Sequence, residues 1–475
     1  MAPPEPRPLL FRNCELGGRR CDVSVRRGRI AAIGDTLMAR GDEQVLEARG
    51  GALLPGLHDH HLHLFGLASA LSSVACGPPE VEDEQALAER LRGATPRSGW
   101  VRGVGYHESV AGHLDRRRLS GFRSDLPVRV QHRTGALWMV NDLGAKALGL
   151  DAPDLPEGVE RDAAGRATGR LFRLDGWLRE RLPGSGPPDL AEVGRLLARH
   201  GVTGVTDAGA DNTPRSVGRL LEARKTGDLP QRLQLLGSSE LGRLDVPAGV
   251  QVGAVKILLD EPRLPQPERL ADRIREAHAA GRGVAIHAVT RAELVLALAA
   301  LEEAGAEPAD RVEHASVAPP DCVAWIRRLG VRVVSQPIFV RERGETYLTE
   351  VEERDRPWLY PGRAWLDAGV PLAAGSDAPY GSPDPWLAMA AAVGRETRCG
   401  ARLAPGEALL PDEALALFLG PLEAPGAPPR VVEPGVHADL CLLDAAWSEV
   451  RSDLRAEHVA ATVCGGHLAW QAPHA

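Results

Sequence analysis

Cysteines in this sequence are few and follow no pairing pattern, and long apolar runs are absent. The seven cysteines are scattered and form no Cys-x-x-Cys motif. This excludes a disulfide framework or a zinc ribbon and favours reduced thiols in a cytoplasm. No run of about 18 apolar residues is present to span a bilayer, and residues 1–20 lack the apolar stretch of a signal peptide. We therefore expect a cytoplasmic protein with no membrane partner.

A dominant charge of one sign is also missing. Lysine and arginine total 56 against 64 acidic residues, for a formal net charge of −8. Because no basic block is present to neutralise a phosphate backbone, the sequence argues against a nucleic-acid partner. Lysine itself is rare: Lys146, Lys225 and Lys256 are the only three, and arginine carries the remaining positive charge.

The sequence does have length, and strand-like segments at both ends. At 475 residues and 44% hydrophobic, the chain can form a large core and two or three structural units. Short strands separated by turns fill residues 8–50, and the pattern returns near the C-terminus in "HADLCLLD" and "HVAATVCGGHLAW". We expect residues 1–55 and 425–475 to form one composite β-sandwich domain.

Between these ends, apolar strand-like runs alternate with helical stretches. With "GALLPGLHD" as the first, there are eight such runs. The other seven are "GVTGVTDAG", "QRLQLLGS", "GAVKILLD", "GVAIHAV", "RVEHAS", "VRVVSQP" and "PLAAGSD". Eight is the strand count of a (β/α)8 TIM-like barrel, so we predict an α/β fold with the barrel over residues 56–424.

Residues 65–195 are too long for one connection after the first strand, so we expect an insertion with structure of its own. The loop after a barrel strand leaves from the catalytic face. The insertion is therefore predicted to form a cap or side lobe over the barrel mouth, with the segment Gln131–Asn141 facing the site.

A dense histidine cluster lies in the first predicted strand, in "LPGLHDHHLHLFG" (residues 54–66). His58 with His60, and His61 with His63, have the i, i+2 spacing that places side chains on one side of an extended strand. Such a cluster indicates a metal site only when further ligands occur elsewhere in the chain; otherwise it is equally typical of a surface or linker cluster.

Further polar residues fall at the ends of other predicted strands. His287 closes "GVAIH", His314 closes "RVEH" and Asp377 closes "LAAGSD", at the face where barrel enzymes place their chemistry. Lys256 lies within "AVKILLD", where burial favours loss of its proton. A neutral amine can add carbon dioxide to give a carbamate that bridges two cations, which arginine cannot easily do. The alternative is a structural lysine paired with Asp260 or Glu261.

Taken in order, these motifs resemble the amidohydrolase superfamily, and specifically amidohydrolase family 3. The matching segments are "LPGLHDHHLHL", "GVTGVTDAG", "VKILLD", "IHAV", "RVEHAS", "YPGRAWLDAGVPLAAGSDAP" and "EPGVHADLCLLD". The resemblance implies a metal-carrying barrel and a composite β-sandwich. It aligns the family's aspartate with Asp59, so that His61 and His63 are the metal ligands. His58 and His60 are then left for packing or for lining the pocket mouth.

The resemblance also implies a two-metal hydrolase of carbon–nitrogen (non-peptide) bonds, acting on a small-molecule amide or cyclic amide through a metal-activated hydroxide. Asp377 is the expected catalytic proton acceptor and donor. Zinc is the expected metal, two ions per chain, and a homodimer is expected from the family. The first cation is assigned to His61, His63 and Asp377, the second to His287 and His314, and the bridge to carbamylated Lys256.

The insertion departs from the family pattern, because Gly135 is followed by Ala136 where many relatives carry Gly-His. This puts in doubt any substrate taken from better-known members. The candidate substrate-binding residues, each also readable as structural or solvated, are His107, His132, Arg133, Trp138 and Arg341.

Three alternative functions remain open: an ester or lactone hydrolase on the same centre, a single-metal deaminase, and a non-catalytic scaffold. Lys256 argues against the deaminase, since such relatives usually lack it. The filled ligand set argues against the scaffold.

Overall fold

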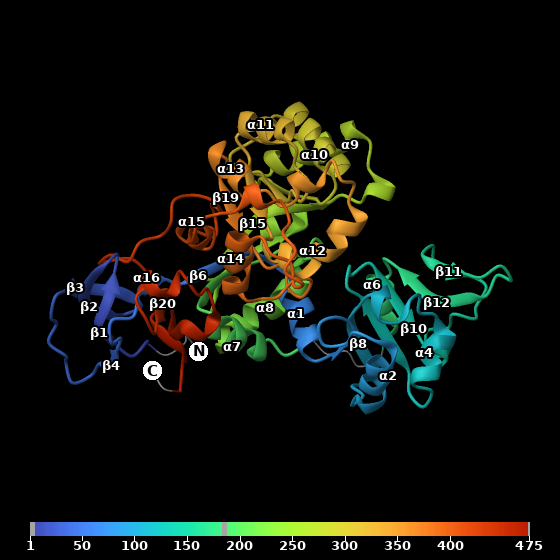
Figure 1. Ribbon diagram of the computed structural model, residues 1–475, viewed down its shortest axis with the longest axis horizontal. Helices are drawn as coiled ribbons and strands as arrows, with labels where there is room; N and C mark the ends of the chain where they lie inside the picture. The colour runs from blue at the N-terminus through green and yellow to red at the C-terminus, as the bar shows by residue number, and fades with distance from the viewer. Residues whose placement is uncertain (1–4, 183–187, 474–475) are drawn as a thin grey trace. The chain divides into compact units, whose positions relative to one another are not determined.

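The computed structural model describes residues 5–182 and 188–473. The chain forms two compact units (Figure 1). The first comprises the described residues up to Leu64 and from Leu190 onward, and the second comprises those within Phe65–Asp189. The predicted sandwich and insertion also include residues 1–4, 183–187 and 474–475, which lie outside the described residues.

The first unit is built on an eight-stranded sheet in which every neighbouring pair is parallel, which confirms the predicted barrel. In chain order, its strands are β6 (Leu57–Leu62), β13 (Val202–Asp207), β14 (Arg232–Gly237), β15 (Val250–Leu258), β16 (Val284–Ala288), β17 (Arg311–His314), β18 (Arg332–Ser335) and β19 (Leu372–Ala374). Seven of the runs identified in the sequence coincide with β13 to β19, whereas the first run, "GALLPGLHD", covers β5 (Leu53–Pro55) of another sheet and only the first three residues of β6. The first and last strands meet just beyond β19, where the backbone N–H of Asp377 donates to the carbonyl oxygen of His61 over 2.7 Å.

Helices and short 3-10 turns precede, connect or follow these strands (Figure 1), and α1 belongs to the second unit apart from Leu64. They are α1 (Leu64–Leu71), α7 (Ala191–Arg199), α8 (Pro214–Thr226), η1 (Ser239–Arg243), η2 (Glu261–Arg263), α9 (Pro267–Ala279), α10 (Arg291–Ala304), α11 (Pro320–Leu329), α12 (Ile338–Glu350), η3 (Arg356–Trp358), α13 (Arg363–Asp367), α14 (Pro385–Gly394), η4 (Pro405–Glu407) and α15 (Pro411–Ala416). Helix α10 begins with a capping box, because the Thr290 and Glu293 side chains each accept from the other's backbone N–H. Glu293 also accepts from the N–H of Glu261 over 2.9 Å. One side chain therefore joins the loops that follow β15 and β16.

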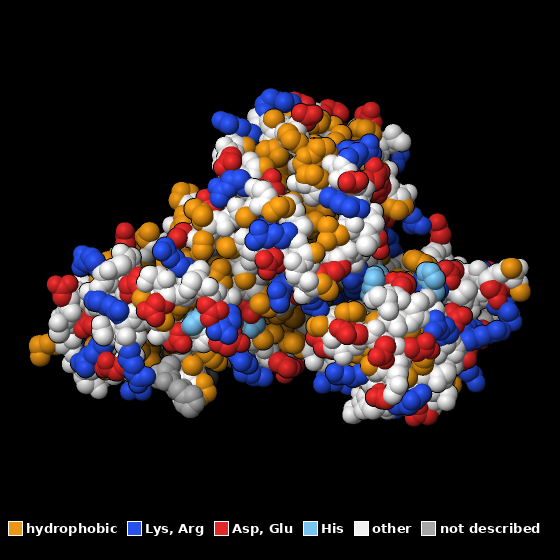
Figure 2. All heavy atoms as spheres, in the orientation of Figure 1, with side chains coloured by type: hydrophobic (Ala, Val, Ile, Leu, Met, Phe, Trp, Pro, Cys, Tyr) orange, Lys and Arg blue, Asp and Glu red, His pale blue; other side chains and the backbone are white. Residues whose placement is uncertain are grey.

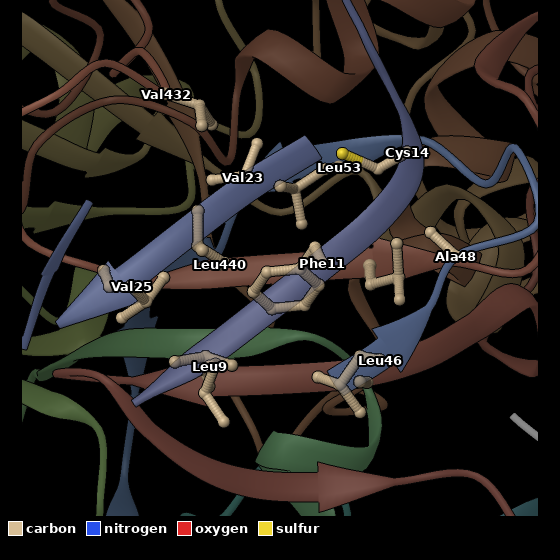
Figure 3. Packing of buried hydrophobic residues seen from close by; sticks show 14 of the residues in the cluster. Leu9, Phe11, Cys14, Val23, Val25, Leu46, Ala48, Leu53, Val432 and Leu440 are labelled. Carbon is tan, nitrogen blue, oxygen red and sulfur yellow. The ribbon is translucent and has the colours of Figure 1, made fainter. Parts of the chain in front are cut away.

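Both ends of the chain also contribute to two four-stranded sheets with a shared core. One has the order β3-β2-β1-β4 and the other β22-β21-β20-β5. Their elements are β1 (Leu9–Leu16), β2 (Arg19–Arg26), β3 (Arg29–Gly34), β4 (Gln44–Glu47), β5 (Leu53–Pro55), β20 (Leu440–Leu443), α16 (Trp447–Val450), η5 (Ala456–His458), β21 (Val459–Cys464) and β22 (His467–Gln471). Figure 3 shows Phe11 and Val23 from the N-terminal strands packing in one cluster with Leu440. The two ends of the chain thus share one β-sandwich core, which anchors β6 at its entry.

The second unit contains a six-stranded sheet in the order β11-β12-β10-β9-β8-β7, with its own helices. Its elements are β7 (Val74–Ala75), α2 (Glu84–Gly93), β8 (Val101–Tyr106), α3 (Glu108–Ala111), α4 (Arg116–Phe122), β9 (Val128–His132), β10 (Leu137–Val140), α5 (Asp142–Ala147), β11 (Val159–Arg161), β12 (Ala167–Phe172) and α6 (Asp175–Arg181). Two separate clusters of buried apolar residues lie within it. The segment is therefore a folded body with cores of its own.

Within residues 5–182 and 188–473, no helix is long and apolar enough to cross a membrane. On the face shown in Figure 2, basic and acidic side chains are interspersed over the surface. This mixture agrees with the absence of a basic block in the sequence.

Candidate metal centre

Three side chains converge where the barrel closes, between β6 and the segment after β19. The potential donor atoms of His61, His63 and Asp377 all lie within 4.8 Å of one another. Asp377 Oδ1 lies 3.1 Å from Nε2 of His63 and 3.4 Å from Nε2 of His61. Two imidazole nitrogens and a carboxylate oxygen are donors that divalent transition metals accept, and a catalytic site needs three such ligands.

The close approach of these strands depends on a glycine. A Cβ atom at Gly375 would lie 2.5 Å from the backbone nitrogen of His61, so any larger residue would force the two segments apart. Asp59 completes the junction, since its Oδ1 accepts the N–H of His61 over 3.0 Å and that of Ser376 over 3.1 Å. Asp59 therefore fixes the backbone on which His61 and Asp377 stand.

His287 and His314 lie beside this cluster. Their ring centroids are 4.5 Å apart, and the ring of His314 is 4.9 Å from that of His61. Burial lowers the pKa of His287 to about 3 and holds that of His314 well below its ordinary value. Both rings are therefore neutral imidazoles, the form that binds metals.

Two of these residues sit on strained backbone. His314 has φ of +69° and Asp377 has φ of +54°, a left-handed region that non-glycine residues rarely adopt. Each costs on the order of 1–3 kcal/mol and persists only where surrounding contacts hold it. Both occur directly at strand ends, where they turn the side chains at the barrel mouth.

Lys256 lies in β15 and is 4% exposed. Its Nζ has no hydrogen-bond partner among the described residues, so the alternative pairing with Asp260 or Glu261 is not formed. Burial lowers the pKa of Lys256 to about 8, although the nearby Glu313 carboxylate opposes this shift. Such an amine is neutral in a substantial fraction of molecules near pH 8, which is the state that adds carbon dioxide.

Two further residues hold the histidines by their other ring nitrogen, and the sequence reasoning missed both. Glu313 Oε2 accepts from Nδ1 of His61, and Gln336 Oε1 lies 2.6 Å from Nδ1 of His314. Their position was a usable signal, because Glu313 directly precedes a ligand candidate in "RVEH" and Gln336 directly follows β18. Their residue types were not a usable signal, since neither glutamate nor glutamine alone indicates a side chain that contacts a metal-binding histidine.

The remaining histidines of β6, His58 and His60, are buried in the strand. His58 is 2% exposed, and its Nδ1 donates to the carbonyl oxygen of Gly420 over 2.9 Å. His60 is fully buried, and burial lowers its pKa to about 3. Of the two roles considered from the sequence, these contacts favour packing over lining the pocket mouth.

On helix α12 the residue near the cluster is Arg343, two positions after the candidate Arg341. Arg341 is exposed, and its carbonyl oxygen accepts the N–H of Arg398. Arg343 donates to the carbonyl oxygen of Tyr380 over 2.8 Å and stacks on Phe339, with its Cζ 3.9 Å from the ring centroid. The Tyr380 ring packs edge-on against His63, with centroids 5.6 Å apart. Arg343 therefore braces a wall of the cluster.

The other substrate-binding candidates belong to the second unit. His132 Nε2 lies 2.9 Å from Oε2 of Glu108, His107 caps α3, and the N–H of Arg133 donates to Tyr106. Trp138 donates to Asp175 over 2.8 Å, and the guanidinium groups of Arg102 and Arg129 each lie over its ring, 5.3 Å from the centroid. Each has a local structural partner, and contact with a substrate stays a prediction.

The donor set fits a divalent cation. It combines the neutral imidazoles of His287 and His314, a carboxylate whose pKa is held well below its usual range, against the effect of burial, by the neighbouring His61 and His63, and a buried amine with no hydrogen-bond partner in the described part of the chain. A parallel barrel with such donors at the carboxyl ends of its strands defines the class of metal-dependent barrel hydrolases.

Comparisons with known proteins agree with this class. The model of the amidohydrolase family matches residues 44–469, so the chain belongs to the amidohydrolase family, whose members hydrolyse carbon–nitrogen bonds. The N-substituted formamide deformylase of Arthrobacter pascens is 29% identical, over 89% of both chains. The YtcJ protein of Bacillus subtilis (strain 168), itself a candidate amidohydrolase, is 25% identical over 75% of this chain and 76% of its own.

A solved structure gives the same fold. The chain superimposes on an uncharacterized metal-dependent hydrolase from Pyrococcus horikoshii with a TM-score of 0.74 and 20% identity, over 95% of this chain and 99% of the other. The match to the family model over residues 44–469 confirms the family predicted from the sequence motifs.

Proposed function

We propose that this protein hydrolyses the carbon–nitrogen bond of a small amide, using divalent cations held at the barrel mouth. The observation that carries the proposal is the convergence of the His61, His63 and Asp377 donor atoms within 4.8 Å. The neutral rings of His287 and His314 beside them support a centre for two cations, as does the amine of Lys256, which has no hydrogen-bond partner within residues 5–182 and 188–473.

The cations are assigned to these residues as follows. His61, His63 and Asp377 hold the first, His287 and His314 hold the second, and Lys256, carbamylated on Nζ, serves both. Zinc is the first choice because imidazole and carboxylate ligands suit it. When bound, the cations lower the pKa of water and polarise a substrate carbonyl.

The chain's own groups then handle the proton. Asp377 Oδ1 is ionised at neutral pH and lies beside both histidines, so it accepts a proton as water adds to the carbonyl carbon. As the carbon–nitrogen bond breaks, Asp377 returns that proton to the departing nitrogen. The products are a carboxylic acid and an amine. The His63 side chain is 27% exposed and marks the open side of the cluster, where the substrate enters.

For the substrate class we propose N-substituted formamides as the first to test. The support is the relative from Arthrobacter pascens, which is named for that reaction and matches 89% of this chain. An ester or lactone hydrolase on the same centre remains the second candidate, because the ligand set suits any acyl carbon.

The test combines metal analysis with a substrate panel. We expect elemental analysis of the purified protein to find two divalent cations per chain, and a chelator to abolish a hydrolysis that added zinc restores. The panel holds N-substituted formamides, cyclic imides and matched esters. Faster turnover of the esters favours the second candidate, and a single cation per chain favours the single-metal alternative. A metal-free active protein contradicts the proposal, as does a metal-loaded protein inert toward every class.

A further inference from the structure

We propose that Glu313 is a positioning residue for the metal centre, and that Arg311 holds it in place. Glu313 fixes the His61 ring so that Nδ1 donates to the carboxylate and Nε2 is left for a cation. The inference rests on the proposed function and assigns no new ligand. It identifies a buried support on which one proposed ligand depends.

The contacts cross the barrel interior. Glu313 and Arg311 are on β17, and His61 is on β6, three places away around the sheet once β19 closes on β6. Oε2 of Glu313 accepts from His61, and Oε1 accepts from Nε of Arg311. Arg311 also donates from Nη2 to the carbonyl oxygen of His60 over 3.0 Å. All these side chains are almost fully buried, with Glu313 at 0% and Arg311 at 3% exposure.

This arrangement determines which nitrogen of His61 faces the cluster. An imidazole has two ring nitrogens, and a carboxylate at Nδ1 makes that nitrogen the donor. Nε2 then points to the other side, where it lies 3.4 Å from Asp377 Oδ1. A carboxylate on the outer nitrogen also raises the basicity of the ligating one. Without the Glu313 carboxylate at Nδ1, this contact no longer determines which ring nitrogen of His61 faces Asp377.

The same contacts argue that Glu313 is not itself a ligand. Each of its two oxygens already has a side-chain partner, one in His61 and the other in Arg311. A buried carboxylate is costly unless paired, and Arg311 supplies the pairing charge. Glu313 is therefore held as an anion in one orientation, which suits positioning.

Strand β17 provides a matched control at its other end. Asp310 immediately precedes the strand and is also 0% exposed. It too binds a histidine, with Oδ1 2.9 Å from Nε2 of His278, and it accepts the N–H of Val284 over 2.9 Å. Asp310 and Glu313 are thus buried carboxylates with similar partners on either end of one strand, but only Glu313 touches a proposed metal ligand.

The experiment compares Glu313→Gln with Asp310→Asn in the zinc-loaded full chain. Each amide has one acceptor oxygen and cannot serve the partners of both carboxylate oxygens. Zinc affinity is measured by competition with a chromophoric chelator, and folding by thermal unfolding. We expect Glu313→Gln to weaken the tighter zinc site by about 10- to 100-fold. We expect Asp310→Asn to lower the melting temperature and leave zinc affinity unchanged.

Two outcomes overturn the inference: wild-type zinc affinity in folded Glu313→Gln, or an equal loss of affinity in Asp310→Asn. A second measurement covers a Glu313→Gln chain that does not fold. In the wild-type zinc protein labelled with ¹⁵N-histidine, we expect the His61 resonances to show a protonated Nδ1 and a metal-bound Nε2. The reverse pattern rejects the inference. A wild-type chain that binds no zinc rejects the proposed function instead, so the two failures are distinguishable.

Discussion

The two ends of the barrel both bury charged side chains, but they arrange them in opposite ways. At the amino ends of the strands, Asp310 is paired with His278, and Asp439 accepts from Arg232 and from the N–H of Gly465. At the carboxyl ends, the donor atoms of His61, His63 and Asp377 point at one another, and Nζ of Lys256 has no hydrogen-bond partner among the described residues.

The difference separates stability from chemistry. A closed network, in which each charge has its partner, stabilises one structure and leaves nothing to bind. An open cluster of convergent donors is costly by itself and becomes favourable when a cation joins it. Barrel enzymes place their sites at the carboxyl ends of the strands. In this chain, the buried charged groups named above point to the same end, because those at the amino ends have partners and the donors at the carboxyl ends converge on one another.

The largest effect that would sharpen this comparison is expected from Asp377→Asn. The amide keeps the shape of the side chain, but it neither accepts the proton of water nor carries the negative charge. We expect kcat to fall by about 10²- to 10⁴-fold, the usual share of general acid–base catalysis. Turnover and zinc content are measured on the same sample. A near wild-type rate at full zinc content would remove Asp377 from the proton pathway.

Lys256 is the next test, because the proposed centre requires its amine to become an anionic carbamate. Lys256→Arg keeps a positive charge that repels the cations, and Lys256→Ala leaves a gap. We expect both variants to hold one cation per chain in place of two. We also expect their activity to fall by more than the roughly 100-fold that is typical when a residue supporting a metal ligand is changed. Short carboxylic acids added to Lys256→Ala should restore part of the metal content and part of the activity.

Elemental analysis with and without added acetate checks this prediction. If Lys256→Arg keeps two cations and the full rate, the lysine is a structural cation and the single-metal alternative becomes the better interpretation.

The barrel could be predicted from the sequence because its information is local. Each strand is a short apolar run, and β15, β16 and β17 carry Lys256, His287 and His314 at or near their ends. The order of these residues along the chain equals their order around the barrel, so eight runs predict both the fold and the residues that meet at its mouth. The matching order of strands in the sheet confirms the fold, and the site residues stay a prediction.

The support of the site could not be predicted, because it is a matter of contacts across the barrel. Glu313 meets His61 from a strand 252 positions later in the chain, and nothing in "RVEH" indicates that partner. Arg343 was not singled out in the sequence for a related reason. Residues two apart on a helix point to different sides, and only the structure shows that Arg343 is the one that contacts Tyr380.

At the closed end, a substitution should reduce stability and spare the metal. Asp439 is 5% exposed, and its two oxygens accept from Arg232 and Gly465. Asp439→Asn removes one acceptor and the charge, so we expect a loss of about 2 kcal/mol in the free energy of unfolding. Zinc content and kcat of the folded fraction should be unchanged. Denaturant unfolding and elemental analysis test both statements, and a loss of zinc would show that the two ends are coupled.

The smallest effect on stability is expected for His60→Leu, which is compared with the same substitution at the neighbouring residue of β6, His61. His60 is fully buried, and neither of its ring nitrogens has a hydrogen-bond partner within the described ranges. His60→Leu replaces an imidazole that makes no polar contact with an apolar side chain of similar size, so its unfolding free energy should change by less than about 1.5 kcal/mol. His61→Leu, one position away, removes a ligand and should lose the cation. Zinc content and denaturant unfolding of the two variants decide the matter. Because both substitutions place leucine in the same buried strand, loss of zinc in His60→Leu would mean that the division of this histidine cluster into packing and binding residues is wrong.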